Sequence, residues 1–134
     1  MRKTQSKTVT WFKSDGTAKP DSEAFANGAV YYADCEGGNA ILHSLQTIWT
    51  AGLVAAAIEF QTCNKPGASL TDDNSTKVWS VESGIVHPAI AAAAGSNMAH
   101  FAANGAARTR AVLTVTTGGP AVSLETYLYE KALS

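Results

Sequence analysis

Histidine and cysteine are the residue types in this chain best suited to catalysis or metal binding. His43, His87 and His100 stand singly, and Cys35 and Cys63 match no metal-ligand spacing. The chain has no G-x-S-x-G, H-E-x-x-H or C-x-x-C motif, each of which would place a nucleophile or metal ligands in a known turn or helix. We therefore expect no enzyme, no metal and no cofactor. The cysteines are predicted to be buried thiols, and His43 falls on an apolar strand face.

Two further groups of polar residues have the chemistry to bind an ion. The stretch TDDNST, residues 71–76, holds carboxylates without the regular spacing of a calcium loop, so we interpret it as a solvated turn. Arg108 and Arg110 share one face of a predicted strand and could hold a phosphate or a carboxylate through forked hydrogen bonds. The preferred interpretation pairs them instead with Glu125 or Glu130 on the strand that follows.

Large aromatic and sulfur-bearing side chains are the candidates for contact with a protein partner. Trp11 and Phe12 are adjacent, so in a strand they point to opposite faces, and one of them needs cover outside the main core. That cover is either a partner subunit or the chain's own sandwich. Arginine and tyrosine are favoured at interfaces. The predicted interface residues are Trp11, Phe12, Met98, His100, Phe101, Arg108, Arg110, Tyr127 and Tyr129.

Alternation of apolar and polar residues with period two dominates the elements that must position these side chains. One predicted strand carries Ile41, His43, Leu45, Thr47 and Trp49 on one face, and the next carries Val54, Ala56, Ile58 and Phe60. The turn at residues 50–52 predicts a hairpin between these two strands, and the Gly-Gly-Pro turn at 118–120 predicts a second hairpin within residues 104–132. Trp49 and Trp79 are expected in the core. Helix is expected only as one turn at residues 89–94.

The pattern predicts an all-β antiparallel β-sandwich or jelly roll of about 7–8 strands. Each strand has one apolar and one mixed face, which is typical of an antiparallel sandwich and not of a parallel sheet buried on both sides. A polar loop at residues 14–28 separates the first strand from the rest. We therefore divide the chain into an N-terminal arm and loop, residues 1–27, and a jelly-roll domain, residues 28–134.

Composition excludes several classes of partner. The 134 residues include 10 basic and 11 acidic ones, a formal net charge of -1, so no field of one sign steers the chain to nucleic acid or to an anionic membrane. The longest apolar runs, GLVAAAI and PAIAAAAG, are too short to span a bilayer, and the N-terminal residues lack the apolar region of a signal peptide. Charged residues make up 16%, below the roughly 25% of an average domain. A surface with few charges points to a protein that works in contact with others.

Three stretches together give a resemblance to known proteins: LQTIWTAGLVAAAIEFQTCN, then VWSVESG, then NGAARTRAVLTVTTGGPAVSLETYLYEK. Their layout resembles the jelly-roll cement or decoration proteins of tailed bacteriophages, over about residues 40–134. The resemblance implies a non-enzymatic virion protein, made in the host cytoplasm, that binds the outer capsid surface and cements neighbouring major capsid subunits. It implies a homo-oligomer, a dimer or a trimer, with no nucleic acid and no membrane as partner.

The alanine-rich stretch HPAIAAAAGSNMAHFAANG suits such docking, because small side chains allow close approach while Met98 and Phe101 act as anchors. The alternative is a crossover packed on its own sheet. AARTRAVLTV is also similar to the penultimate strand of discoidin-type sugar-binding sandwiches. A carbohydrate-binding module is therefore the second expectation for function.

Overall fold

The computed structural model describes residues 4–35, 42–49, 55–90, 95–102, 108–117 and 124–131. Within these ranges the regular structure consists of strands, and no helix there is long and apolar enough to cross a membrane. The strands are β1 (Thr4–Thr8), β2 (Phe12–Lys13), β3 (Val30–Asp34), β4 (Leu42–Trp49), β5 (Ala55–Cys63), β6 (Ser80–Val86), β7 (Gly95–Ala102), β8 (Arg108–Thr117) and β9 (Leu124–Lys131).

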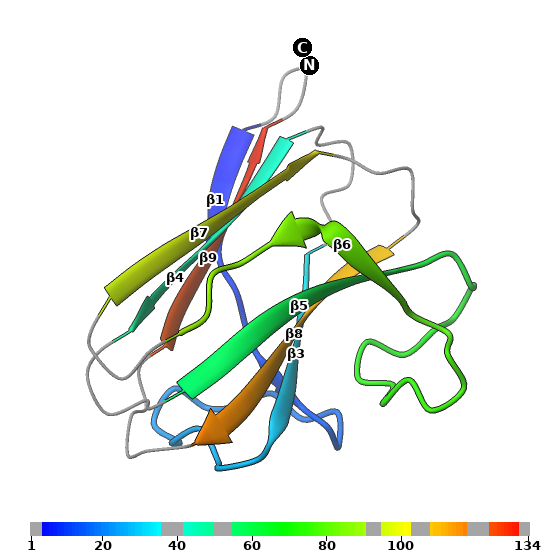
Figure 1. Cartoon of the computed structure of the whole chain (residues 1–134), viewed down its shortest axis with the longest axis horizontal. Helices are drawn as coiled ribbons and strands as arrows, with labels where there is room; N and C mark the ends of the chain where they lie inside the picture. Colours follow the sequence, from blue (N-terminus) through cyan, green and yellow to red (C-terminus); the bar gives the residue numbers. More distant parts are fainter. Residues whose placement is uncertain are drawn as a thin grey trace.

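The strands form two antiparallel sheets that lie as separate layers (Figure 1). The first sheet has the order β1-β9-β4-β7 and the second has the order β2-β3-β8-β5-β6. Apart from the short β2, this is the strand order of a jelly roll, in which the first strand pairs with the last and the chain crosses repeatedly between layers. The predicted all-β antiparallel sandwich is confirmed.

Both predicted hairpins are wrong. β4 lies in the first sheet and β5 in the second, and β8 and β9 are separated in the same way. β8 pairs with β3 and β5, whereas β9 pairs with β1 and β4. Alternation shows that one face of each strand is buried, but it does not identify the neighbouring strand. The intervening residues are numerous enough to reach the opposite sheet about 10 Å away, so a turn signal alone does not establish a hairpin.

Residues 4–13 of the segment set apart as an arm contribute one strand to each sheet. β1 pairs with β9 along its whole length, and β2 pairs with β3. Between them the chain crosses from one sheet to the other, with the Val9 amide donating to the Thr126 carbonyl at 2.8 Å. The crossing carries Trp11 into the core, where it is 4% exposed.

The core lies between the two sheets and follows the predicted alternation. Leu45, Trp49, Ile58 and Phe60 are buried in it, as expected from the sequence. Leu113 and its alternate neighbours on β8 face the same core. Cys35 and Cys63 are both buried thiols, as predicted.

His87 joins the two sheets through buried polar contacts. Its Nδ1 lies 2.7 Å from the Pro88 carbonyl oxygen, which can only accept, so this nitrogen carries the proton. Nε2 is then free of a proton and accepts from the Thr47 hydroxyl of β4 at 2.8 Å. Both side chains are buried. A neutral His87 therefore fixes the end of β6 against the first sheet.

We expect this contact to make stability depend on pH. Burial lowers the pKa of His87 below its ordinary 6.5, and the bond to the Pro88 carbonyl opposes this only in part. Between the folded and unfolded pKa values the unfolded chain binds more protons, so the stabilisation is complete above pH 6.5 and is lost as the pH falls through the folded value. Urea unfolding at pH 6.5 and at about pH 5 should show a larger loss in the wild type than in His87→Gln. Equal losses in the two proteins would contradict the assignment.

Gly95 begins β7 directly opposite Trp49, and the approach is close. A Cβ at position 95 would lie 2.9 Å from Trp49 Cζ2, inside the contact distance of two carbons. Gly95→Ala should therefore lower the free energy of unfolding by about 1–3 kcal/mol, the usual cost of overpacking. The matched control is Gly84→Ala on β6, where the nearest atom, Glu82 Oε1, is at an ordinary 3.6 Å. Equal unfolding free energies for the two variants would show that Trp49 moves aside without cost.

Candidate functional site

The outer face of the first sheet brings together four of the predicted interface residues. Tyr127 on β9 lies opposite Gln46 of β4, which in turn lies opposite Met98 of β7. Tyr129 and His100 occupy the next row, on either side of β4. Their neighbours in sequence, such as Leu128, are buried between the sheets. We call this surface the tyrosine–methionine face; its side chains are Ser6, Thr8, Ser44, Gln46, Ile48, Ser96, Met98, His100, Glu125, Tyr127 and Tyr129.

The tyrosine–methionine face is rich in hydroxyl groups and carries little charge, and its apolar surface comes from Ile48, Met98 and the two tyrosines. Met98 is 40% exposed and Tyr129 is 42% exposed. Glu125 is the one Asp, Glu, Lys or Arg residue among the described side chains of the face. The Tyr127 hydroxyl donates to Glu125 Oε1 at 3.0 Å, which raises the pKa of Tyr127 and keeps the phenol protonated. Tyrosine and methionine are enriched at protein interfaces and acidic residues are depleted there, so the face has the composition of a docking surface.

The other aromatic candidates lie elsewhere. Trp11 is a core residue whose Nε1 donates to the Thr126 hydroxyl at 2.9 Å. Phe12 is half-buried on β2, at the edge of the second sheet. Phe101 pairs with His43 in the β4–β7 register, and its side chain lies outside the described part of the structure. The sequence therefore predicts correctly that Trp11 and Phe12 point to different surroundings, while Trp11 finds its cover inside its own chain.

Arg110 is not a surface residue but the centre of a buried clamp. Its side chain is 1% exposed and lies on the outer side of the second sheet, beneath the loop of residues 64–79. The guanidinium carbon sits 4.3 Å from the Trp79 ring centroid and 4.6 Å from that of Tyr32. Nε and Nη2 both donate to Gln61 Oε1, at 2.9 and 2.7 Å. Nη1 donates to two carbonyl oxygens of the loop, those of Leu70 and Asp72, each at 2.8 Å.

The predicted pairing of the arginines with Glu125 or Glu130 is wrong, because those residues belong to β9 in the other sheet. Arg108 donates instead to the Ala68 carbonyl of the loop and lies 3.9 Å from a carboxylate oxygen of Asp34. For the same reason, the predicted interface residues Arg108 and Arg110 do not lie on one surface with Tyr127 and Tyr129 of β9. The two arginines hold a loop on the second sheet, and Arg110 is out of reach of a partner.

The loop itself explains why Trp79 is buried without belonging to the central core. The Asn74 side chain bonds both the amide and the carbonyl of Trp79, each at 2.8 Å, and the indole Nε1 donates to the Ser69 carbonyl at 3.2 Å. Asp72 and Asp73 each accept from a backbone amide two residues ahead. The carboxylates of TDDNST thus form turns, as the sequence predicts, and hold Trp79 over the arginines.

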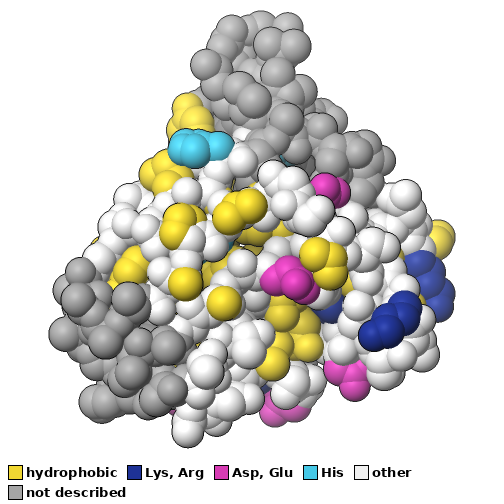
Figure 2. Space-filling model, in the orientation of Figure 1, with side chains coloured by type: hydrophobic (Ala, Val, Ile, Leu, Met, Phe, Trp, Pro, Cys, Tyr) yellow, Lys and Arg dark blue, Asp and Glu magenta, His cyan; other side chains and the backbone are white. Residues whose placement is uncertain are grey.

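A second set of exposed apolar side chains lies on β6, at the edge of the second sheet. Val86 is 71% exposed and Val81 is 57% exposed. In Figure 2, hydrophobic side chains gather where β6 and β7 cross the view, and Lys and Arg side chains appear toward the side of the 64–79 loop. β6 and β7 are edge strands of their sheets, so on this side each has an edge that no other described strand pairs with.

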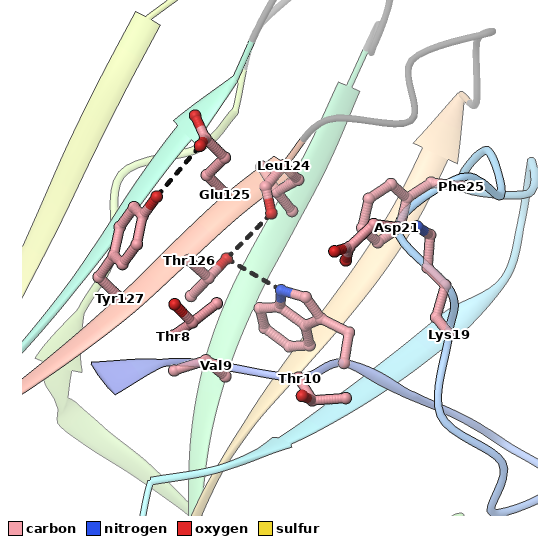
Figure 3. A pocket seen from close by; sticks show the side chains of 11 residues that line it. Thr8, Val9, Thr10, Lys19, Asp21, Phe25, Leu124, Glu125, Thr126 and Tyr127 are labelled. Carbon is pink, nitrogen blue, oxygen red and sulfur yellow. Dashed lines mark hydrogen bonds between the residues drawn. The ribbon is translucent and has the colours of Figure 1, made fainter.

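A pocket of about 310 Å³ opens beside the tyrosine–methionine face (Figure 3). Its walls come from three segments: the crossing at residues 8–11, the loop at residues 19–25 and the start of β9 at residues 124–127. Lys19, Phe25 and Trp11 are buried in its floor, whereas Asp21 and Thr10 stand exposed at its rim. This pocket is not predictable from the sequence, because residues from such distant segments show no common spacing.

The outward members of β4, in contrast, could have been found from the sequence. The alternation that predicts Leu45 and Thr47 inside also places Gln46 and Ile48 outside.

No protein-family model matches this chain, and the curated proteins contain no significant match to it.

Proposed function

We propose that this protein is a non-enzymatic structural protein of a tailed-bacteriophage virion, which docks on the outer capsid surface and cements neighbouring major capsid subunits. The observation that carries the proposal is the tyrosine–methionine face, a sheet surface with exposed Tyr129 and Met98 and with Glu125 as the one Asp, Glu, Lys or Arg among its described side chains. The resemblance of residues 40–134 to capsid decoration proteins supplies the nature of the partner.

The physical basis is the removal of apolar surface from water on many copies at once. Burial of apolar area contributes about 25 cal/mol per Å². Cementing requires each copy to contact more than one capsid subunit, so that modest contacts per copy add up over the shell. A sheet face suits this role because its side chains stand on hydrogen-bonded strands and lose little freedom on docking.

Self-association into a dimer or a trimer belongs to the same proposal. β7 pairs with β4 on one side, and none of the described strands pairs with its other edge. The described residues Gly95 to His100 of β7 carry no lysine, aspartate or glutamate, the side chains that commonly protect an edge strand from pairing. A second copy of the chain can therefore pair with the edge of β7, next to the surface that carries Met98 and Tyr129.

Co-sedimentation tests the proposal. Purified protein is mixed with capsid shells that lack this protein. The shells are assembled from the major capsid protein encoded in the same genome. We expect saturable binding at a fixed ratio to the major capsid protein, together with increased resistance of the shells to heat. A protein that stays in the supernatant, and that is a monomer by analytical ultracentrifugation, would sink the proposal.

A further inference from the structure

We propose that the pocket between the strand crossing at residues 8–11, the loop at residues 19–25 and β9 binds a neutral saccharide unit. The pocket shares Thr8, Glu125 and Tyr127 with the edge of the tyrosine–methionine face, whereas Lys19, Asp21 and Phe25 lie outside that face. The proposal does not depend on capsid binding. Pockets of this size, with an apolar floor and a few converging polar groups, are the usual form of small-ligand sites.

The floor of the pocket is apolar and already ordered. Trp11, Phe25 and Leu124 are each no more than 6% exposed. The hydrogen bond from the indole Nε1 to the Thr126 hydroxyl fixes the Trp11 ring, as Figure 3 shows. A ligand therefore finds the aromatic surface in place and bears little cost of ordering it. The C–H face of a sugar ring matches such a floor.

Lys19 provides a hydrogen-bond donor, and its side chain is buried, which is unusual for a lysine. The side chain is 7% exposed, and Nζ lies 4.1 Å from the Phe25 ring centroid. Nζ donates to the Pro20 carbonyl at 3.0 Å, which uses one of the three N–H groups of an ammonium. Burial lowers the pKa of Lys19. Lysines are rarely buried unless they are paired, so this ammonium is well placed to bond a ligand hydroxyl.

The charges at the rim decide the class of ligand. Asp21 and Glu125 are exposed carboxylates that line the pocket (Figure 3). An anionic ligand meets these two carboxylates, and a cationic ligand meets Lys19. A neutral polyol satisfies both kinds of group, because each hydroxyl donates to a carboxylate or accepts from the ammonium. The threonine hydroxyls of Thr8 and Thr10 add two groups of the same dual character.

The test is a titration followed by ¹H–¹⁵N NMR, with methyl glucoside, galactoside and mannoside as neutral probes, glucosamine as a cation and glucuronate as an anion. We expect at least one neutral glycoside to shift the Trp11 indole N–H signal with saturation at millimolar concentration. Both charged sugars should bind more weakly. Asp21→Asn and Lys19→Met should each weaken binding about tenfold or more, because each removes a charged hydrogen bond.

Asp73→Asn is the matched control, since Asp73 lies in another loop and asparagine keeps an oxygen that can accept from the Ser75 amide. This variant should bind sugar like the wild type. The proposal is overturned if no glycoside shifts the Trp11 signal, if a charged sugar binds most tightly, or if Asp21→Asn binds like the control. Because Lys19 is buried, Lys19→Met can fail to fold. In that case Asp21→Asn, at the exposed rim, tests whether the pocket binds a saccharide. Neither variant alters the tyrosine–methionine face, so shell binding reports on the proposed function separately.

Discussion

Arg110→Met should lower the free energy of unfolding by about 3 kcal/mol. Methionine keeps the length of the apolar stem but cannot donate, so Gln61 Oε1 and the carbonyls of Leu70 and Asp72 lose their partner. A buried acceptor without a donor costs about 1–3 kcal/mol, and water restores part of this once the loop loosens. Urea unfolding followed by circular dichroism measures the difference.

The control for this prediction is Lys65→Met, which removes a positive charge from an exposed position of the same loop. It should change the unfolding free energy by no more than about 0.5 kcal/mol. Arg110→Lys should behave more like the methionine variant than like the wild type, because an ammonium cannot reproduce the fork that holds Gln61 and the loop together. If Arg110→Met is as stable as Lys65→Met, the clamp does not hold the loop.

Met98→Glu combined with Tyr129→Glu should weaken shell binding by about 100-fold or more. Each substitution places a carboxylate on the tyrosine–methionine face, and burying an unpaired charge against a partner costs more than the apolar contact it replaces. Both residues are about 40% exposed, so the free energy of unfolding should change by no more than about 1 kcal/mol. Co-sedimentation over a range of protein concentrations gives the ratio of affinities.

Val86→Glu is the matched control for the double variant. Val86 is also exposed, but it lies on β6 in the second sheet. Shell binding that survives Val86→Glu and is lost in the double variant assigns docking to the tyrosine–methionine face. Binding that is lost in Val86→Glu and kept in the double variant would show that docking uses the β6 side of the molecule instead.

The sequence was sufficient to predict which face of each strand is buried, but not which strands pair with one another. Period-two alternation correctly predicted that Leu45, Ile58 and Leu113 are buried, because burial follows directly from the pleat of a strand. Strand pairing depends on where each strand lies in the completed sandwich. The turn residues after β4 and β8 suit a hairpin as well as a crossing to the other sheet, so the hairpin predictions failed.

The arginines show the same limit for a site. Alternation correctly placed Arg108 and Arg110 on the side of β8 away from the core. It could not show that the 64–79 loop folds back over that side, because the contacts that hold it join Arg110 to Leu70 and Asp72, which lie about forty residues away along the chain. In contrast, residue type together with alternation on a predicted strand singled out Tyr129, which is exposed. Met98 was singled out only as an anchor in the alanine-rich stretch, and the strand β7 that carries it was not predicted.

Hydroxyl-radical footprinting of the wild-type protein, free and bound to shells, tests the docking proposal most directly. Methionine and tyrosine react readily with the radical, so Met98 and Tyr129 act as built-in reporters. We expect both to lose most of their labelling on the shell, while Val81 and Val86 on β6 are labelled as in the free protein. Undiminished labelling of Met98 and Tyr129 in the bound state would contradict docking through the tyrosine–methionine face.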